Sequence, residues 1–308
     1  MLEVLSRTEL HVDNPPGAAP CRVLSAASGL VQRDGRWYVV ADDEQHLAVI
    51  DAASGHGRWL RLFDGELPGG PAQRKAAKPD LETLIELPAL DELPFGALLA
   101  LGSGSRPNRQ TGVLIAFDAH GDLTGAPRLI DLAALYAPLR LAAVDLNIEG
   151  GFCRGDDFLL LQRANQGRAG NARIRFAWHE VWPWLLGHDD VVAPSAHETV
   201  GYALGTIDGV ALGFSDAAAL PNGDWVFSAV AEATADSYHD GACMGSVIGR
   251  VDADGSLRSL QRLEGLWKVE GIAVVAQVGG DAPLELTLIT DADDRGRPTT
   301  CLKVRMSL

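Results

Sequence analysis

The sequence predicts an all-β protein, a five-bladed β-propeller with four strands per blade. Three observations point to this fold. Five segments of the 308-residue chain open with an acidic or hydroxyl residue and continue as a short apolar run. Each opening is followed by a similar order of β-rich runs and turns. The last repeat is one run short, and a β-rich run at the N-terminus can complete it, which is how a propeller closes its ring.

The repeats are spaced along the whole chain. Their openings are separated by 54, 67, 66 and 55 residues and fall at Ser28, Glu82, Glu149, Ser215 and Glu270. The first repeat contains the runs "GLVQ", "RWYVVA", "HLAVID" and "RWLRLF", and the second contains "LETLIEL", "GALLALG", "GVLIAF" and "PRLIDL". Branched and aromatic residues bounded by Asp-Gly, Asn-Gly and Gly-Gly are typical of strands and turns.

The later repeats follow the same order. The third reads "IEGGF", "DFLLLQ", "ARIRFAW" and, after an insertion, "GYALGTI", and the fourth reads "VALGFSDAAAL", "DWVFSAV", "SVIGRVD" and "LRSLQRL". The fifth has only "VEGIAVV", "LELTLITD" and "TCLKVRM". The segment "LEVLSRTELHV" near the N-terminus is expected to be its fourth strand. A sandwich or a parallel β-helix would not require this closure.

We expect a single propeller domain over residues 1–308, with an insertion at about 178–200. The insertion reads "WHEVWPWLLGHDDVVAPSAHETV", and its Trp182-Pro183-Trp184 segment suggests a short helix or a cap outside the blade. A sixth, degenerate blade at this place is the alternative.

Composition excludes several classes of partner. The chain is 47% hydrophobic, as globular proteins are, and its formal net charge is −15. No basic stripe is available for nucleic acid or for an anionic membrane. No apolar run is long enough to span a bilayer, and no signal peptide is recognised, so a cytoplasmic location is expected. The four cysteines have no CxxC spacing and are expected to be reduced.

The five openings predict a metal site. Since the first strand of each propeller blade lines the central channel, the five opening residues are expected to form a ring. Converging carboxylates raise one another's pKa until protons or a cation neutralise them. A set of oxygen ligands selects a hard ion, and one Ca²⁺ suits this ring better than Mg²⁺, which keeps more waters. The alternative is a set of polar strand ends that meet solvent. Asp216 competes with Ser215 for the fourth position.

Polar loops are expected on the same face as the ring, because the loop between the second and third strands of a blade lies there. They carry arginines suited to bind a small anionic molecule, namely Arg106, Arg109, Arg163, Arg168 and Arg295, with Arg297 nearby. Asp42 and Asp43 follow the second strand of the first repeat, where a carboxylate can orient water. The alternative is the ordinary polar composition of turns.

Three segments resemble a known family. "GLVQRDGRWYVVADDEQHLAVID", "FSDAAALPNGDWVFSAV" and "LWKVEGIAVV" are similar to parts of the soluble calcium-activated nucleotidases, or apyrases. The resemblance implies a five-bladed propeller with one Ca²⁺ in its channel and hydrolysis of nucleoside di- and triphosphates. It places calcium ligands on Ser28, Glu82, Glu149, Ser215 and Glu270, and it matches an acidic pair to Asp42-Asp43.

Other features depart from that family. The loops "GSGSRPNRQTG" and "QRANQGRAGN" do not resemble its substrate loops. The motif "EGIA" followed by "LITDADDRGRP" also resembles esterase-like phytase and uncharacterised bacterial propellers. The resemblance therefore bears on the fold and the metal more than on the substrate.

Three functions follow as hypotheses. The first is a calcium-dependent hydrolase of a phosphorylated small molecule, in which the arginines hold phosphate and Asp42 or Asp43 orients water. The second is a lactonase or esterase. The third is a non-catalytic propeller that binds a ligand or a protein and has a structural Ca²⁺. The fold alone does not choose among them.

Overall fold

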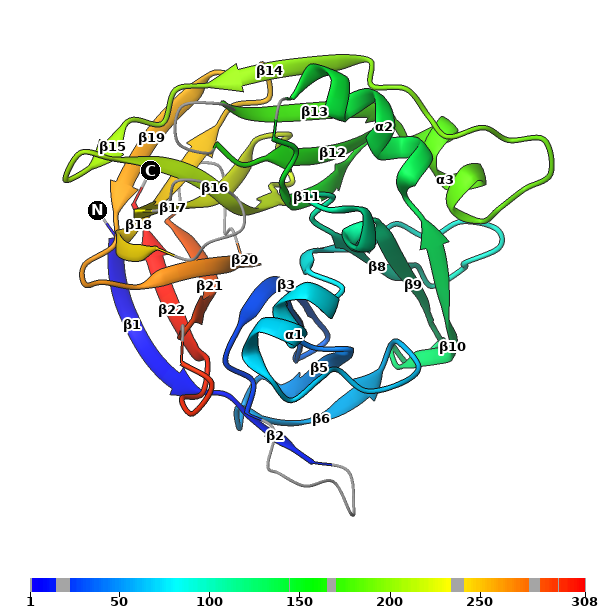
Figure 1. The fold of residues 1–308 in the computed structure, drawn as a ribbon. Helices are drawn as coiled ribbons and strands as arrows, with labels where there is room; N and C mark the ends of the chain where they lie inside the picture. The colour runs from blue at the N-terminus through cyan, green and yellow to red at the C-terminus, as the bar shows by residue number, and fades with distance from the viewer. Residues whose placement is uncertain are drawn as a thin grey trace.

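The computed structural model contains five small sheets arranged around a central axis (Figure 1). It describes residues 2–14, 23–143, 145–164, 170–233, 241–276, 283–292 and 294–307. The innermost strands contact one another in a closed ring of five, which confirms the five-bladed propeller. Among the described residues, no helix combines the length and apolar character needed to cross a membrane.

The first two blades have the predicted order of strands from the axis outward. The first contains β3 (Ala27–Arg33), β4 (Arg36–Ala41), β5 (His46–Asp51) and β6 (His56–Arg61). The second contains β7 (Leu81–Leu87), β8 (Ala97–Gly102), β9 (Thr111–Phe117) and β10 (Leu123–Asp131). The turn from β3 to β4 is made by Asp34 and Gly35, with φ of 48° and 74°. Two successive positive φ angles are the signature of a tight hairpin turn.

The next two blades follow the same plan. The third contains β11 (Ile148–Arg154), β12 (Asp157–Gln162), β13 (Asn171–Ala177) and β14 (Glu198–Tyr202). The fourth contains β16 (Val210–Ala219), β17 (Trp225–Ala233), β18 (Ala242–Val251) and β19 (Leu257–Arg262), with the short β15 (Thr206–Ile207) added beside β16. The expected strand "GYALGTI" is thus divided, since β14 ends the third blade and β15 joins the fourth.

The N-terminal segment closes the ring as predicted. The fifth blade contains β20 (Lys268–Ala276), β21 (Leu284–Asp291), β22 (Thr300–Met306) and, outermost, β1 (Leu2–Glu9). β1 pairs antiparallel with β22. The chain then continues into β2 (His11–Asp13), which pairs parallel with β6 of the first blade. The N-terminal segment therefore joins the last blade to the first.

Helices lie in the connections between strands. They are α1 (Pro71–Ala77), the 3₁₀ helix η1 (Pro107–Arg109), α2 (Ala133–Ala142) and α3 (Trp178–Leu185). The insertion at about 178–200 forms α3 and a following segment between β13 and β14, and it does not form a sixth blade. Trp178, Val181 and Leu185 of α3 are buried in the core between the second and third blades.

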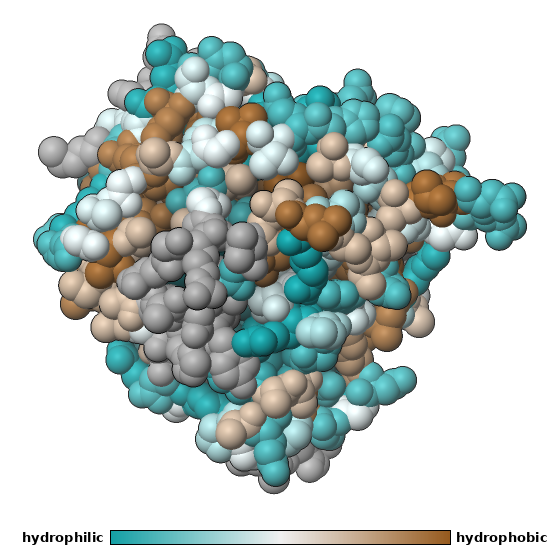
Figure 2. All heavy atoms as spheres, turned by 45° about the horizontal axis from the view of Figure 1, so that its top comes forward, coloured by the Kyte–Doolittle hydropathy of each residue, from teal (hydrophilic) through white to brown (hydrophobic). Residues whose placement is uncertain are grey.

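The core consists of five apolar clusters, one at each junction between neighbouring blades. This arrangement follows from sheets that are apolar on both faces and pack face to face around the axis. The outer surface is mixed. Figure 2 shows hydrophobic residues in several separate groups among hydrophilic ones on the visible face.

Candidate metal centre and adjoining pocket

Each innermost strand carries a β-bulge at the predicted ring residue. The pairing register shifts across Ser28 in β3, Glu82 in β7, Glu149 in β11, Ser215 in β16 and Glu270 in β20. A bulge leaves one residue unpaired and redirects its side chain, and bulges are frequent beside functional sites. Since the five strands form a closed ring, the five bulges lie on neighbouring strands around the axis. Among the described residues, the acidic groups close enough together to share a metal ion are those of Glu82, Asp42 and Asp80, and not the three ring glutamates.

The residue after each bulge lies where neighbouring blades approach closely. Gly150 follows Glu149, and a Cβ atom on it would lie 2.8 Å from the Cα atom of Asp216 in the next blade. A Cβ atom on Gly29, after Ser28, would lie 2.8 Å from the backbone nitrogen of Leu84. Only glycine permits these two backbone approaches. The level below the bulges is therefore the narrow part of the channel.

The three ring glutamates repel one another. Burial raises the pKa of Glu82, and Glu149, Asp80 and Asp42 raise it further. Burial likewise raises the pKa of Glu149, although Arg163 opposes the shift. Burial raises the pKa of Glu270 to about 8 against the lowering effect of Arg163 and Lys268. Each shift shows that the ionised carboxylate is poorly solvated.

The two ring serines bind to the neighbouring blade. Ser28 Oγ donates a hydrogen bond of 2.6 Å to the carbonyl of Leu81, the residue before Glu82. Ser215 Oγ donates one of 2.7 Å to the carbonyl of Val269, the residue before Glu270. The hydroxyl protons therefore link adjacent bulges, while the oxygen lone pairs are still able to act as ligands.

Asp216 has a different role from Ser215. It is 1% exposed, and its carboxylate accepts hydrogen bonds from the backbone N–H groups of Ala217, at 2.8 Å, and Ile272, at 3.0 Å. Burial raises its pKa well above the ordinary value, and the backbone N–H groups, including that of Leu30, oppose the shift. Asp216 therefore links the backbones of neighbouring blades at the narrow part of the channel, and Ser215 is the residue at the bulge.

Two cationic side chains pair with the ring on the side of the third to fifth blades. Arg163 lies 3.1 Å from Glu149, 2.8 Å from Glu232 and 3.7 Å from Glu270. Lys268 Nζ lies 2.8 Å from Asp291 and 3.9 Å from Glu270. These contacts partly neutralise the ring glutamates.

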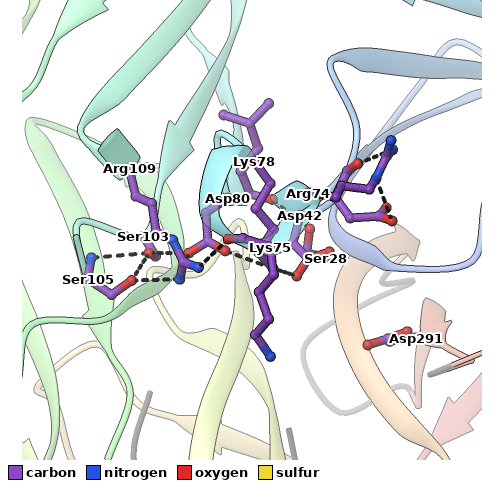
Figure 3. A network of polar contacts seen from close by, with 12 residues as sticks. Ser28, Asp42, Arg74, Lys75, Lys78, Asp80, Ser103, Ser105, Arg109 and Asp291 are labelled. Atoms are coloured by element: carbon purple, nitrogen blue, oxygen red, sulfur yellow. Dashed lines mark hydrogen bonds and ion pairs between the residues drawn. The ribbon is translucent and has the colours of Figure 1, made fainter. Parts of the chain in front are cut away.

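A second cluster lies beside Glu82. Oxygen atoms of Asp42, Asp80 and Glu82 all lie within 4.8 Å of one another, a separation at which they are able to hold a metal ion. Lys78 contacts Asp42 and lies 2.9 Å from Asp80 (Figure 3). Burial by itself lowers the pKa of Lys78, but the three carboxylates raise it above its ordinary value, so this side chain is a cation. Within the described part of the chain, Glu82 forms no salt bridge or hydrogen bond, although Lys78 lowers its pKa.

Negative charge exceeds positive charge in this connected network. Among the described residues, seven carboxylates belong to it, namely Asp42, Asp80, Glu82, Glu149, Glu232, Glu270 and Asp291. Four cations face them, namely Lys78, Arg109, Arg163 and Lys268. Protons or a further cation must balance the remainder, because buried charges are costly when they are unpaired.

The predicted arginines lie in different surroundings. Arg109 is 3% exposed and donates hydrogen bonds of 2.8 Å to Asp80 and 3.0 Å to Ser105, so it belongs to the buried network like Arg163 (Figure 3). Arg106 is exposed. Arg295 is exposed and lies 3.5 Å from Asp43. Arg168 lies outside the described residues.

A pocket of about 210 Å³ adjoins the cluster of Asp42, Asp80 and Glu82, between the first and fifth blades. Asp42, Asp43, Lys78, Lys268 and Arg295 line it, together with Arg74 and Lys75 of α1. Burial raises the pKa of Asp43, and Asp42 raises it further, while Arg74 and Arg295 lower it. A carboxylate with a raised pKa beside a cation-lined pocket is suited to accept a proton from water near neutral pH.

Several site residues were not predicted. Lys78, Asp80, Asn147, Glu232 and Lys268 all belong to the network, and Asn147 donates a hydrogen bond of 2.5 Å to Glu149. For three of these residues, the sequence contained a spacing that could have predicted their place in the site. Asp80, Asn147 and Lys268 each precede a ring glutamate by two residues, and side chains two apart in a strand share a face.

Stability of the metal-free protein is expected to fall as pH rises from about 4.5 to about 8. In the folded state the pKa of Glu270 is about 8, above its ordinary 4.5, so the folded protein holds this proton more tightly than the unfolded chain does. Melting temperatures measured in EDTA across this range will check the slope. Glu270→Gln is expected to reduce the slope of melting temperature against pH, and saturating Ca²⁺ is expected to make the melting temperature nearly independent of pH. A melting temperature in EDTA that does not change with pH would contradict this account of the ring.

The fold is similar to those of several solved structures. An α-L-arabinofuranosidase from Podospora anserina is 10% identical over 97% of this chain and 94% of its own, with a TM-score of 0.48. The calcium-binding protein regucalcin from Agrobacterium tumefaciens is 11% identical over 93% of each chain, with a TM-score of 0.43. A gluconolactonase from Xanthomonas campestris is 14% identical over 90% of this chain and 72% of its own, with a TM-score of 0.42. At 10–14% sequence identity, this similarity concerns the fold alone and not the chemistry of the site.

Sequence comparison gives a family and no curated relative. No curated protein matches the chain significantly. Residues 23–306 match the model of a family of unknown function, DUF6929, and the chain therefore belongs to that family.

Proposed function

We propose that this propeller is a metal-dependent hydrolase that binds one Ca²⁺ at the polar end of its channel and acts on a small anionic molecule. The observation that supports the proposal best is the set of five bulges. They lie at three glutamates and two serines on neighbouring strands around the axis.

The donor set fits calcium. The ring offers only oxygen atoms, and Ca²⁺ takes about 6–8 of them in flexible geometry. The network has more carboxylates than cations, and Glu82 forms no salt bridge within the described part of the chain. Ring residues Ser28, Glu82, Glu149, Ser215 and Glu270 would hold the ion. When bound there, Ca²⁺ would act as a Lewis acid toward a substrate oxygen.

The pocket beside the ring supplies the groups that would bind the substrate and activate water. Arg295, Arg74 and Lys75 line it and are suited to orient a phosphate group, since guanidinium and ammonium groups donate to phosphate oxygens. Asp43 is placed to accept the proton of an attacking water, and Arg74, 3.4 Å away, fixes its position. Asp42 contacts Lys78 and supports the metal cluster. A phosphorylated small molecule is the substrate class that this lining favours.

Lactone or ester hydrolysis is the second candidate. The pocket lining is nearly balanced in charge, because Asp42, Asp43, Asp291 and Asp294 face the five cations Arg74, Lys75, Lys78, Lys268 and Arg295. A neutral carbonyl substrate would therefore also fit this lining. The same carboxylate would activate water in either reaction.

Turnover is expected in Ca²⁺ and not in EDTA when the protein is offered nucleotides, phosphomonoesters, lactones and aryl esters. Asp43→Asn is expected to lower kcat by about a hundredfold or more, because it removes the general base. Asp189→Asn, an exposed position in the segment after α3, is the matched control and should leave kcat unchanged. Phosphate release alone would support the first candidate, and turnover of lactones or esters alone the second. Calcium binding with no turnover on the panel would contradict a hydrolase and favour a binding protein.

A further inference from the structure

A second, larger cavity lies at the other end of the channel. Its volume is about 620 Å³, and all five innermost strands line it. Its lining begins two residues beyond each bulge, at Leu30, Leu84, Gly151, Ala217 and Ile272. Gly29, Gly150 and Asp216, where neighbouring blades approach closely, lie along the strands between this cavity and the ring residues.

The lining of this lower cavity offers polar and apolar surface in nearly equal parts. The apolar residues that line it include Leu30, Leu84, Leu87, Phe152, Ile272 and Val274. Cys153 also lines it, and burial raises the pKa of its thiol to about 12, so the thiol is neutral. Arg33 and Glu86 are the charged residues of this lining, whereas nine charged residues line the pocket at the polar end.

The charged residues in this lining neutralise each other. Arg33 lies 3.1 Å from Glu86 and 3.2 Å from Asp34. Its guanidinium also donates a hydrogen bond of 3.0 Å to the carbonyl of Phe95. Since the arginine has two carboxylate partners, the lower cavity presents no net positive charge that would attract an anion.

A loop extends over the mouth of the lower cavity. Residues 88–96 connect β7 to β8, and Pro88, Pro94 and Phe95 contribute to the lining. The corresponding connections of the first and third blades are two-residue turns. Arg33 anchors the loop through Phe95, whose side chain is 43% exposed at the mouth. The second blade therefore supplies a wall that the first and third blades lack.

We propose that the lower cavity is a binding site for an uncharged small molecule with both apolar and polar groups, separate from the candidate metal centre. Its volume lies within the range of about 300–1,000 Å³ that is typical of small-molecule sites. Burial of the apolar part of the ligand in the cavity supplies part of the affinity. The backbone groups on the inner edges of the strands are available to polar atoms of the ligand, and the Arg33–Glu86 pair disfavours a charged one.

Two fluorescent probes with a shared aromatic frame test this proposal on the full-length protein. N-phenyl-1-naphthylamine is neutral, and 1-anilinonaphthalene-8-sulfonate carries one negative charge. The neutral probe is expected to saturate at one molecule per chain and to bind about tenfold or more tightly than the sulfonate. Glu86→Gln removes one partner of Arg33, and it should strengthen binding of the sulfonate several-fold without changing that of the neutral probe.

A variant that fills the cavity tests whether the neutral probe binds there. Ala218 lines the cavity and is partly exposed. Ala218→Trp should therefore fill the space and weaken binding of the neutral probe by about tenfold or more. Ala53→Trp, at an exposed turn outside the cavity, should bind like wild type. Absence of saturable binding, or equal affinity in Ala218→Trp, would overturn the proposal.

Modification of Cys153 provides a readout in the unmutated protein. The saturating neutral probe should slow its alkylation, measured by mass spectrometry, while leaving that of Cys243 in β18 unchanged. An unchanged rate at Cys153 would overturn the proposal even if Ala218→Trp fails to fold.

Discussion

Replacement of Trp225 by alanine is expected to lower the free energy of unfolding by about 3–5 kcal/mol. Trp225 is fully buried in the cluster between the third and fourth blades. Its ring centroid lies 5.4 Å from that of Phe152 in the third blade and 5.5 Å from that of Phe227 in its own blade. Removal of the indole leaves a cavity at the junction where the third and fourth blades pack against each other. Urea unfolding followed by tryptophan fluorescence or circular dichroism will measure the loss.

Trp184→Ala is the matched control for this substitution. Trp184 lies in α3 at the edge of the core and is only partly buried. Its replacement should lower the free energy of unfolding by clearly less, because solvent can fill the space that the indole leaves. A loss below about 1 kcal/mol for Trp225→Ala would contradict blade packing as the main source of stability.

Arg163→Met is expected to destabilise the metal-free protein by about 3–5 kcal/mol. The guanidinium is buried and contacts Glu149, Glu232 and Glu270, and its loss leaves three buried carboxylates with less compensation. Ca²⁺ should recover part of the lost stability, because the ion neutralises the same glutamates. Thermal unfolding in EDTA and in saturating Ca²⁺ will separate the two contributions.

Arg106→Met tests whether the effect is specific to the buried network, since Arg106 is exposed. It should change the melting temperature little under either condition. If Arg163→Met were as stable as wild type but bound substrate poorly, Arg163 would be a substrate-binding residue, as the loop composition first indicated, and the structural role assigned to it would be wrong.

The sequence was sufficient to predict the propeller because its signals are local and repeated. Turn residues such as Asp34-Gly35 and the regular apolar runs define the strands, and the shortened fifth repeat requires a strand from elsewhere. The pairing of β2 with β6 had no such signal, because it depends on the path of the chain after ring closure. The last strand of the third repeat was placed too late, since the insertion with α3 shifts its start.

The ring residues could be predicted because each occupies the same point of its repeat. The cations that face them could not. Lys78 reaches Asp42, 36 residues earlier in the chain, because the connection containing α1 returns across the first blade (Figure 1). Arg163 and Arg109 were predicted to bind an anionic substrate, and the structure pairs both with buried carboxylates. That pairing depends on side-chain direction, which composition does not reveal.

Calcium titration of EDTA-stripped protein by isothermal calorimetry is the decisive test of the proposed metal ring. We expect one Ca²⁺ per chain, and Glu82→Gln should weaken binding by about tenfold or more, because it removes the ring carboxylate that forms no salt bridge within the described residues. Glu285→Gln in β21, whose side chain is 43% exposed, should bind like wild type. A wild-type protein that binds no calcium, with a melting temperature indifferent to EDTA, would contradict the metal ring. The buried carboxylates would then be balanced by protons and by the four cations Lys78, Arg109, Arg163 and Lys268.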